Sequence, residues 1–306
     1  MNDNKLPRQS RPYFLNYSAS RKTPILNAFM FERDLPLGIM PYRRRRANDD
    51  FKVSLEPPNS DNEKVVIDLL SDLGGRAHDL EDAMTNFIER AVHYLAHHGE
   101  LFFELLSDES GVKQLATLPP GRIVHVGRRY IQIIPKVDRN KDDPWAIYIP
   151  EKKIWHLTLP SELGSPAMHR KMIDGLNELS EPMPKFALED TSLGSNSGYD
   201  FMNHRANIDM AIEQLTLRWG SIPSFNQIKG TSEYYYIFNR LRFSHAQALI
   251  REHIVEEFNR LLKRIGIEDS IKVVGLPLAE DILIAIDDLD AGKIGFDKAL
   301  KLINLD

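Results

Sequence analysis

The sequence contains no cysteine. This absence excludes a disulfide framework, a thiolate nucleophile, cysteine-ligated zinc and an iron–sulfur cluster. No stretch reaches the roughly eighteen uncharged apolar residues that a membrane helix needs, and the start of the chain lacks the apolar core of a signal peptide. With 42% hydrophobic and 27% charged residues, the 306-residue chain is typical of a folded protein. We therefore expect a cytoplasmic protein without membrane contact.

Catalytic motifs are also lacking. The sequence has no Gly-x-Ser-x-Gly elbow, no dinucleotide-binding fingerprint and no kinase signature. The glycine-rich stretch Gly194–Gly198 lacks the Lys-Ser/Thr ending and the preceding buried strand of a phosphate-binding loop, which favours a connection between helices. We therefore predict that the chain is not an enzyme and binds no cofactor.

The net charge of -5 gives no global attraction to nucleic acid or anionic lipid. The charge is unevenly distributed, however. Residues 1–52 carry a net charge of +6, whereas residues 266–306 carry -5. A basic start and an acidic end favour pairing between subunits.

The first 60 residues contain seven prolines, which argues against long helices and predicts an extended arm with apolar segments at 25–31 and 35–40 that dock onto the body. Helical spacing of apolar residues follows over 65–95 and ends near Gly99. Six short β-branched or aromatic runs then predict an antiparallel meander, and they span residues 101–106, 114–118, 123–126, 130–134, 145–149 and 154–159.

A second helical block follows the predicted strands. Helices are expected over 167–179 and 199–219, and residues 231–265 run about 35 residues without Gly or Pro, which corresponds to roughly 50 Å of helix. A short strand at 271–274 and helices at 279–289 and 296–303 complete the chain. The predicted fold class is α+β, with an antiparallel β meander layer flanked by helices. The predicted domains are a basic arm (1–60), a helix-plus-sheet domain (61–180), a long-helix region (181–265) and an α/β tail (266–306).

Three histidines close the first helical block. His93, His97 and His98, with Glu89 one turn earlier, place imidazoles at i and i+4, which is the spacing of metal ligands on a helix. No third ligand and no His-Glu-x-x-His order accompanies them. A metal site and a histidine-rich helix C-terminus are both compatible with this pattern.

The long predicted helix carries two further clusters. Arg251, Glu252 and His253, followed by Glu256 and Glu257, are compatible with acid–base chemistry in a cleft or with i,i+4 pairs on a solvated or intersubunit face. The run Tyr234–Tyr236 beside Arg240 and Arg242 is compatible with base stacking or with packing at a helix start.

Adjacent arginines are the strongest electrostatic feature. Arg43, Arg44, Arg45 and Arg46 can neutralise phosphates, and Arg128 and Arg129 are further candidates, as is the Arg170-Lys171 pair. The alternative is a solvated run balanced by Asp49 and Asp50. We therefore treat Arg43–Arg46, Arg128 and Arg129 as candidate nucleic-acid-binding residues.

One stretch resembles a known family. The text "HYLAHHGELFFELLSDESG", "LATLPPGRIVHVGRRYIQIIPK" and "IWHLTLP" is similar to the wing of tailed-phage portal proteins, in which a helix leads into a "G-E-x-x-x-E" strand that opens an antiparallel layer. The downstream helices, including "YYYIFNRLRFSHAQALIREHIVEEFNRLL", resemble the portal stem and its return into the wing. The order of elements matches over about two-thirds of the chain.

This resemblance implies a homo-oligomeric ring at one capsid vertex, through which double-stranded DNA passes during packaging. It also implies capsid and terminase proteins as partners, and a location in the cytoplasm during assembly and in the virion afterwards. The chain is short for that family, so a C-terminal helical crown would be small or missing. A host-encoded relative, derived from a prophage or used in antiviral defence, stays open as a nucleic-acid- or protein-binding module. A metal-dependent enzyme using His93, His97 and Glu89 stays open as a third hypothesis.

Overall fold

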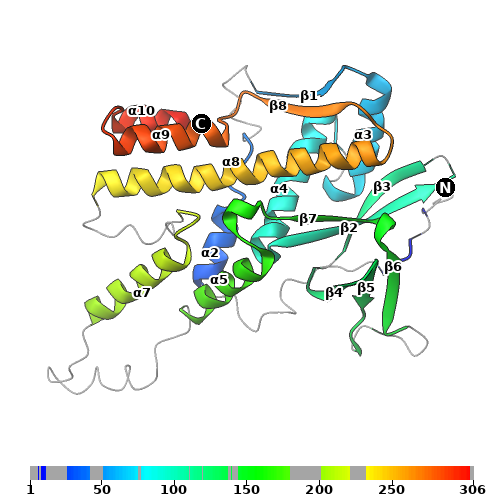
Figure 1. Ribbon diagram of the computed structural model, residues 1–306, viewed down its shortest axis with the longest axis horizontal. Helices are drawn as coiled ribbons and strands as arrows, with labels where there is room; N and C mark the ends of the chain where they lie inside the picture. Colours follow the sequence, from blue (N-terminus) through cyan, green and yellow to red (C-terminus); the bar gives the residue numbers. More distant parts are fainter. Residues whose placement is uncertain are drawn as a thin grey trace.

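Helices and small antiparallel sheets alternate along the chain (Figure 1). The structure, a computed structural model, describes residues 6, 8–11, 26–41, 51–74, 77–109, 111–118, 120–136, 139, 144–179, 201–220 and 232–303. Within these residues the predicted α+β class is confirmed, because helices flank antiparallel sheets and one helix is 32 residues long.

All six predicted strands form, and they lie in two sheets. The first sheet has the order β3 (Gly111–Leu118), β2 (Glu100–Asp108), β7 (Ile154–Thr158), and the second has the order β4 (Ile123–Val126), β5 (Arg129–Ile133), β6 (Ala146–Pro150). Only the second is a sequential meander, because β7 crosses back to pair with β2. β2 is buried on both faces, which explains its nearly continuous apolar text.

Two helices cover the first sheet. α3 (Ser60–Gly74) and α4 (Leu80–His98) form at the predicted apolar periodicity. Asp79 caps α4 by accepting a hydrogen bond from the backbone N–H of Asp82 at 2.7 Å, and Gly99 ends the helix at a φ of +72°. An aromatic group then joins α4, β2, β7 and the long helix, with ring centroids 5.0 to 6.0 Å apart, and consists of Phe87, Phe103, Trp155 and Phe258.

The long helix α8 (Glu233–Arg264) begins and ends within two residues of its predicted bounds. At 1.5 Å per residue it is about 48 Å long. Its first half packs on α9 (Ala279–Asp290) and α10 (Phe296–Ile303) in a separate small core. Its second half packs on α4 and β7, so that α8 links the two cores (Figure 1).

Two elements of the N-terminal 60 residues join the main body. α2 (Leu26–Asp34) contacts α4 and α5 (Pro166–Glu178), and Phe31 packs edge-on against Trp219 at 5.2 Å, just after α7 (Phe201–Leu215). β1 (Lys52–Glu56) pairs antiparallel with β8 (Ser270–Val274), so an early segment meets the C-terminal region. The predicted docking of the apolar segments therefore takes the form of a helix and the turn after it. The predicted division into domains stays a prediction.

Among the helices of the described ranges, none has the length together with the apolar character that crossing a bilayer requires.

Candidate functional site

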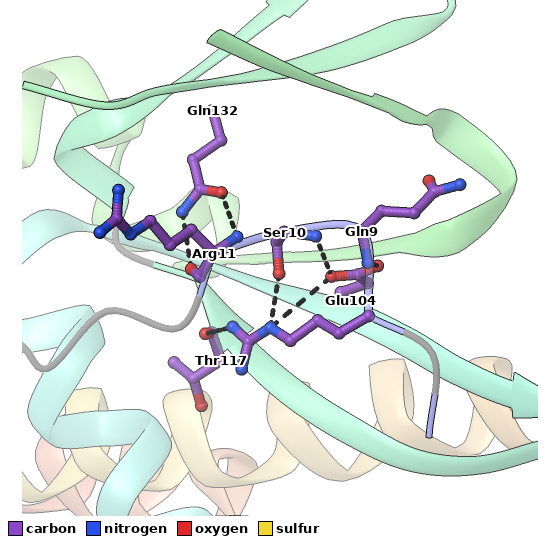
Figure 2. A network of polar contacts seen from close by, with 7 residues as sticks. Gln9, Ser10, Arg11, Glu104, Thr117 and Gln132 are labelled. Carbon is purple, nitrogen blue, oxygen red and sulfur yellow. Dashed lines mark hydrogen bonds and ion pairs between the residues drawn. The ribbon is translucent and has the colours of Figure 1, made fainter. Parts of the chain in front are cut away.

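The N-terminal residues 8–11, called here the docked segment, lie against both three-stranded sheets. Glu104 of β2, only 1% exposed, accepts hydrogen bonds from the backbone N–H groups of Gln9 at 2.8 Å and Ser10 at 2.9 Å (Figure 2). Both donors belong to the main chain, so the carboxylate binds the backbone of a bend at residues 9 and 10 and not a particular side chain. A buried carboxylate that receives two N–H groups is a strong anchor.

Gln132 of β5 holds the next residue of the docked segment. Its Oε1 accepts from the backbone N–H of Arg11 at 2.8 Å, and its Nε2 donates to the carbonyl of Arg11 at 3.0 Å. This pair of bonds imitates the exchange between two antiparallel strands. The amide side chain, also buried, therefore fixes the direction and the position of the docked segment.

The side chain of Arg8 completes the network. Its Nη2 donates to the carbonyl of Thr117 at 3.1 Å, and its Nε donates to Oγ of Ser10 at 2.7 Å. The same Nε lies 3.9 Å from the Glu104 carboxylate, so the guanidinium supplies a countercharge to the buried anion. Sequence reasoning missed this site. Its one local signal is that Glu104 is the only charged residue in the apolar run 101–106.

In the segment Gly99–Glu104 ("GELFFE"), the glycine and both glutamates have structural roles. A Cβ on Gly99 would lie 3.0 Å from both the Cβ of His169 and the Cα of Pro166, so the helix-to-strand turn needs glycine there. Glu100 precedes Glu104 by four positions, so both side chains lie on the same face of β2. Arg170 of α5 donates to Glu100 at 2.8 Å, which ties this helix to the strand.

Glu100 also contacts β7. His156 Nε2 lies 3.1 Å from its Oε2, and the His156 ring stacks on Phe102 at 4.2 Å. Burial raises the pKa of Glu100, but the hydrogen bond and charge of His156 and the charge of Arg170 more than offset it, so the pKa lies below its ordinary value. Glu100 therefore stays ionised and holds three elements together.

The histidine cluster forms a contact between helices. His97 Nδ1 lies 2.9 Å from Oε2 of the buried Glu32 of α2, and the rings of His93 and His97 meet edge-on at 5.2 Å. Burial lowers the pKa of His93, the neighbouring His97 and Arg90 lower it further, and Glu32 opposes them. Glu89 is exposed. Across the described ranges, no group of three or more His, Asp and Glu side chains is arranged to hold a metal ion.

Polar side chains of α8 hold the segment after α2. Gln247 donates to the carbonyls of Leu35 at 3.0 Å and Leu37 at 2.6 Å. One turn later, the buried Arg251 donates to the carbonyls of Ile39 at 3.4 Å and Pro277. Burial lowers the pKa of Arg251 to about 10, against the opposing charge of Glu252, and the guanidinium therefore remains charged at neutral pH.

The acidic residues proposed for acid–base chemistry make structural contacts. Glu252 accepts from the backbone N–H of Ala279 at the start of α9, at 2.8 Å. Glu256 and Glu257 both pair with Arg260 on the same helix. The two pairs with Arg260 agree with the interpretation as ion pairs of a helix surface, whereas Glu252 ties α8 to the start of α9.

The tyrosine run packs within the small core. Tyr234 donates its hydroxyl to Oδ1 of Asp290 at 2.7 Å and stacks on Phe238 at 5.8 Å. Arg240 donates to the Tyr236 hydroxyl at 3.3 Å. The packing interpretation therefore accounts for Tyr234 and Tyr236.

The structure separates the candidate arginines. Arg128 and Arg129 are exposed at the turn between β4 and β5, whereas Arg170 is engaged by Glu100. The strongest candidate run, Arg43–Arg46, and the glycine-rich stretch Gly194–Gly198 lie outside the described residues. The structure therefore brings no group of these predicted phosphate-binding residues together within its described part.

No protein-family model matches the chain, and no curated protein matches it in sequence. Among solved structures, the chain is similar to one described as the neck of an empty GTA particle computed with C6 symmetry. The two chains are 13% identical, the comparison covers 90% of this chain and 88% of that chain, and the TM-score is 0.48.

Proposed function

We propose that the chain is a non-enzymatic structural subunit that assembles into a homo-oligomeric ring, and that the ring conducts double-stranded DNA as a phage portal does. Its partners are then further copies of itself, DNA, and the capsid or terminase proteins of a virion. The proposal rests on the site at Glu104 and on the order of elements that resembles the portal wing and stem.

A single observation carries the proposal. The text "GELFFE", on which the portal resemblance depends, also builds the site that holds the N-terminal docked segment, through Glu104. This site binds backbone groups, so a segment supplied by a neighbouring copy fits it as well as one supplied by the same copy. A proline-rich arm and a backbone-reading site are the parts that an interlocked assembly requires.

Negative-stain imaging of the purified protein tests the proposal. We expect rings of uniform diameter with a central opening wide enough for a DNA duplex to pass. Single particles of the size of one 35.1 kDa chain at micromolar concentration would contradict the proposal.

A second candidate function is a nucleic-acid-binding module without a ring. The exposure of Arg128 and Arg129 favours it, together with the arginine run at 43–46. If it holds, replacing Arg43–Arg46 by Ala weakens the binding of a DNA duplex and flattens the dependence of affinity on salt concentration. Unchanged affinity and salt dependence would remove this candidate.

A further inference from the structure

The outer face of the second sheet is apolar and largely exposed. Its inner face buries Tyr130, Gln132 and Ile149. Because side chains alternate along a strand, the intervening residues point outward. Val124, Ile131 and Tyr148 lie side by side across the three strands, and Tyr148 is 55% exposed. We call this surface the sheet face, and it consists of Val124, Val126, Ile131, Ile133 and Tyr148.

Two cations border the sheet face. Arg129 is the first residue of β5 and, two positions before Ile131, shares its outward direction. Arg128 precedes it in the turn, and both side chains are exposed. Within the described part of the chain, neither arginine pairs with a carboxylate. The sheet face is therefore an apolar surface with a positive edge.

The exposed side of α9 has the opposite pattern. Glu280, Leu283, Ile284 and Asp287 follow the i, i+3, i+4, i+7 spacing of one helical stripe, and all four are exposed. Leu283 is 46% exposed and Ile284 is 53% exposed, while the other side of the helix packs into the small core against α8. We call this stripe the helix face. It is an apolar pair between two carboxylates.

The two faces lie toward opposite ends of the molecule. α9 runs along the first half of α8. In Figure 1, β4, β5 and β6 lie on the side of the first sheet that faces away from α8. They cannot therefore cover each other within one chain. They match each other in character, since each presents apolar side chains beside charges that attract those of the other.

We propose that the sheet face of one copy binds the helix face of the next copy. This proposal rests on the proposed ring and names the contact that builds it. A contact between two different surfaces of identical chains is heterologous, and repeated copies of such a contact close into a ring when the rotation between neighbours permits. An apolar centre with a charged border is the usual anatomy of a stable protein interface.

The aliphatic character of the sheet face favours a protein partner over a nucleic acid. A surface that binds DNA through phosphates needs a row of cations, whereas Val124, Val126, Ile131 and Ile133 offer none. Burying these side chains against Leu283 and Ile284 removes apolar surface from water on both sides, which stabilises the contact.

The decisive experiment uses two charge-reversed full-length proteins. The sheet variant carries Arg128→Glu and Arg129→Glu, and the helix variant carries Glu280→Lys and Asp287→Lys. Alone, each variant places like charges in every contact, so light scattering should report a single-chain mass. Mixed one to one, each contact of an alternating ring again joins opposite charges, and the wild-type mass should return.

Matched controls lie on α5, away from both faces. Lys171 and Asp174 are exposed there, and Lys171→Glu and Asp174→Lys should leave the wild-type mass unchanged. Circular dichroism and urea unfolding of the wild type and of every variant establish that a loss of assembly does not arise from misfolding.

The outcomes separate this contact from the ring itself. A single-chain mass for the wild type contradicts both proposals. A wild type that assembles, with variants that assemble equally well, overturns the contact and leaves the ring standing. Variants that stay single chains when mixed also overturn the contact. A sheet variant that keeps its assembly but loses DNA binding assigns this surface to nucleic acid and overturns the contact too.

Discussion

Ser10 donates its backbone N–H to Oε2 of Glu104 at 2.9 Å, although the two residues lie 94 positions apart in the chain. The neighbouring Gln9 uses the other carboxylate oxygen in the same way. The anchor therefore depends on two acceptor atoms that only a carboxylate provides at this position.

We predict that Glu104→Gln releases the docked segment. The substitution leaves one acceptor and turns an amide NH2 toward a backbone N–H, so a stabilising bond becomes a contact between two donors. Hydrogen bonds to buried charged groups are worth about 2 kcal/mol, which corresponds to amide exchange about 30-fold faster at Gln9 and Ser10. Hydrogen–deuterium exchange with mass spectrometry measures this rate.

The matched control for this prediction is Glu109→Gln, the same substitution at an exposed position in the turn between β2 and β3. It should leave the exchange of residues 9 and 10 unchanged. Equal exchange rates in wild type and Glu104→Gln would show that the carboxylate does not anchor the segment.

Gly220 permits a close approach between the end of the α7 region and α8. It adopts a φ of +64°, and a Cβ there would meet the Cβ of Arg242 and lie 2.7 Å from the carbonyl oxygen of Asn239. Gly266 has a similar φ of +91°, but among the described residues, its two chain neighbours aside, no atom lies within 4 Å of the position that a Cβ would take there. Comparing alanine substitutions at Gly220 and Gly266 therefore separates the cost of backbone strain from the cost of steric overlap.

We predict that Gly266→Ala costs about 1 kcal/mol of unfolding free energy, the usual penalty of a left-handed conformation. Gly220→Ala should cost about 2 kcal/mol more, because overpacking adds to the same strain. Urea unfolding of both variants measures the difference. Equal losses at the two positions would mean that α7 and α8 do not approach as closely as described.

Two half-buried histidines should make stability depend on pH. Burial lowers the pKa of His245, Arg242 lowers it further and Glu162 opposes them, and burial likewise lowers the pKa of His93. In the unfolded chain both groups titrate near 6.5. The unfolded state therefore binds protons before the folded state does, so stability is complete above pH 6.5 and falls as the pH drops through the lower folded pKa values.

The double variant His93→Gln and His245→Gln should reduce the slope of unfolding free energy against pH. Each histidine removed lowers the slope by at most the contribution of one bound proton. Urea unfolding between pH 5.0 and about 7.5, a range chosen around the ordinary histidine pKa, provides the slope. An unchanged slope in the double variant would assign the pH dependence to other groups.

Local patterns predicted most of the secondary structure. The apolar stripe of 231–265 gave the long helix α8, and the β-branched runs between turn residues gave all six strands of the two three-stranded sheets. These elements are coded by neighbouring residues, so periodicity and turn chemistry are sufficient to find them.

Such local patterns could not predict the pairing of segments that lie far apart in the sequence. β1 forms because β8, more than 200 residues later, supplies its partner strand, and nothing near Lys52 indicates this. The same holds for the docked segment, since Glu104 and Gln132 come from different sheets and meet residues 9–11 only in the folded chain. His97 meets Glu32 of α2 in the same way, through a pairing that the residues near His97 do not indicate.

The mass of the full-length protein in solution tests the account most directly. Multi-angle light scattering over a series of concentrations should give one discrete mass that is a whole multiple of 35.1 kDa and does not change on dilution. A mass of one chain at every concentration would contradict a subunit built to assemble with copies of itself.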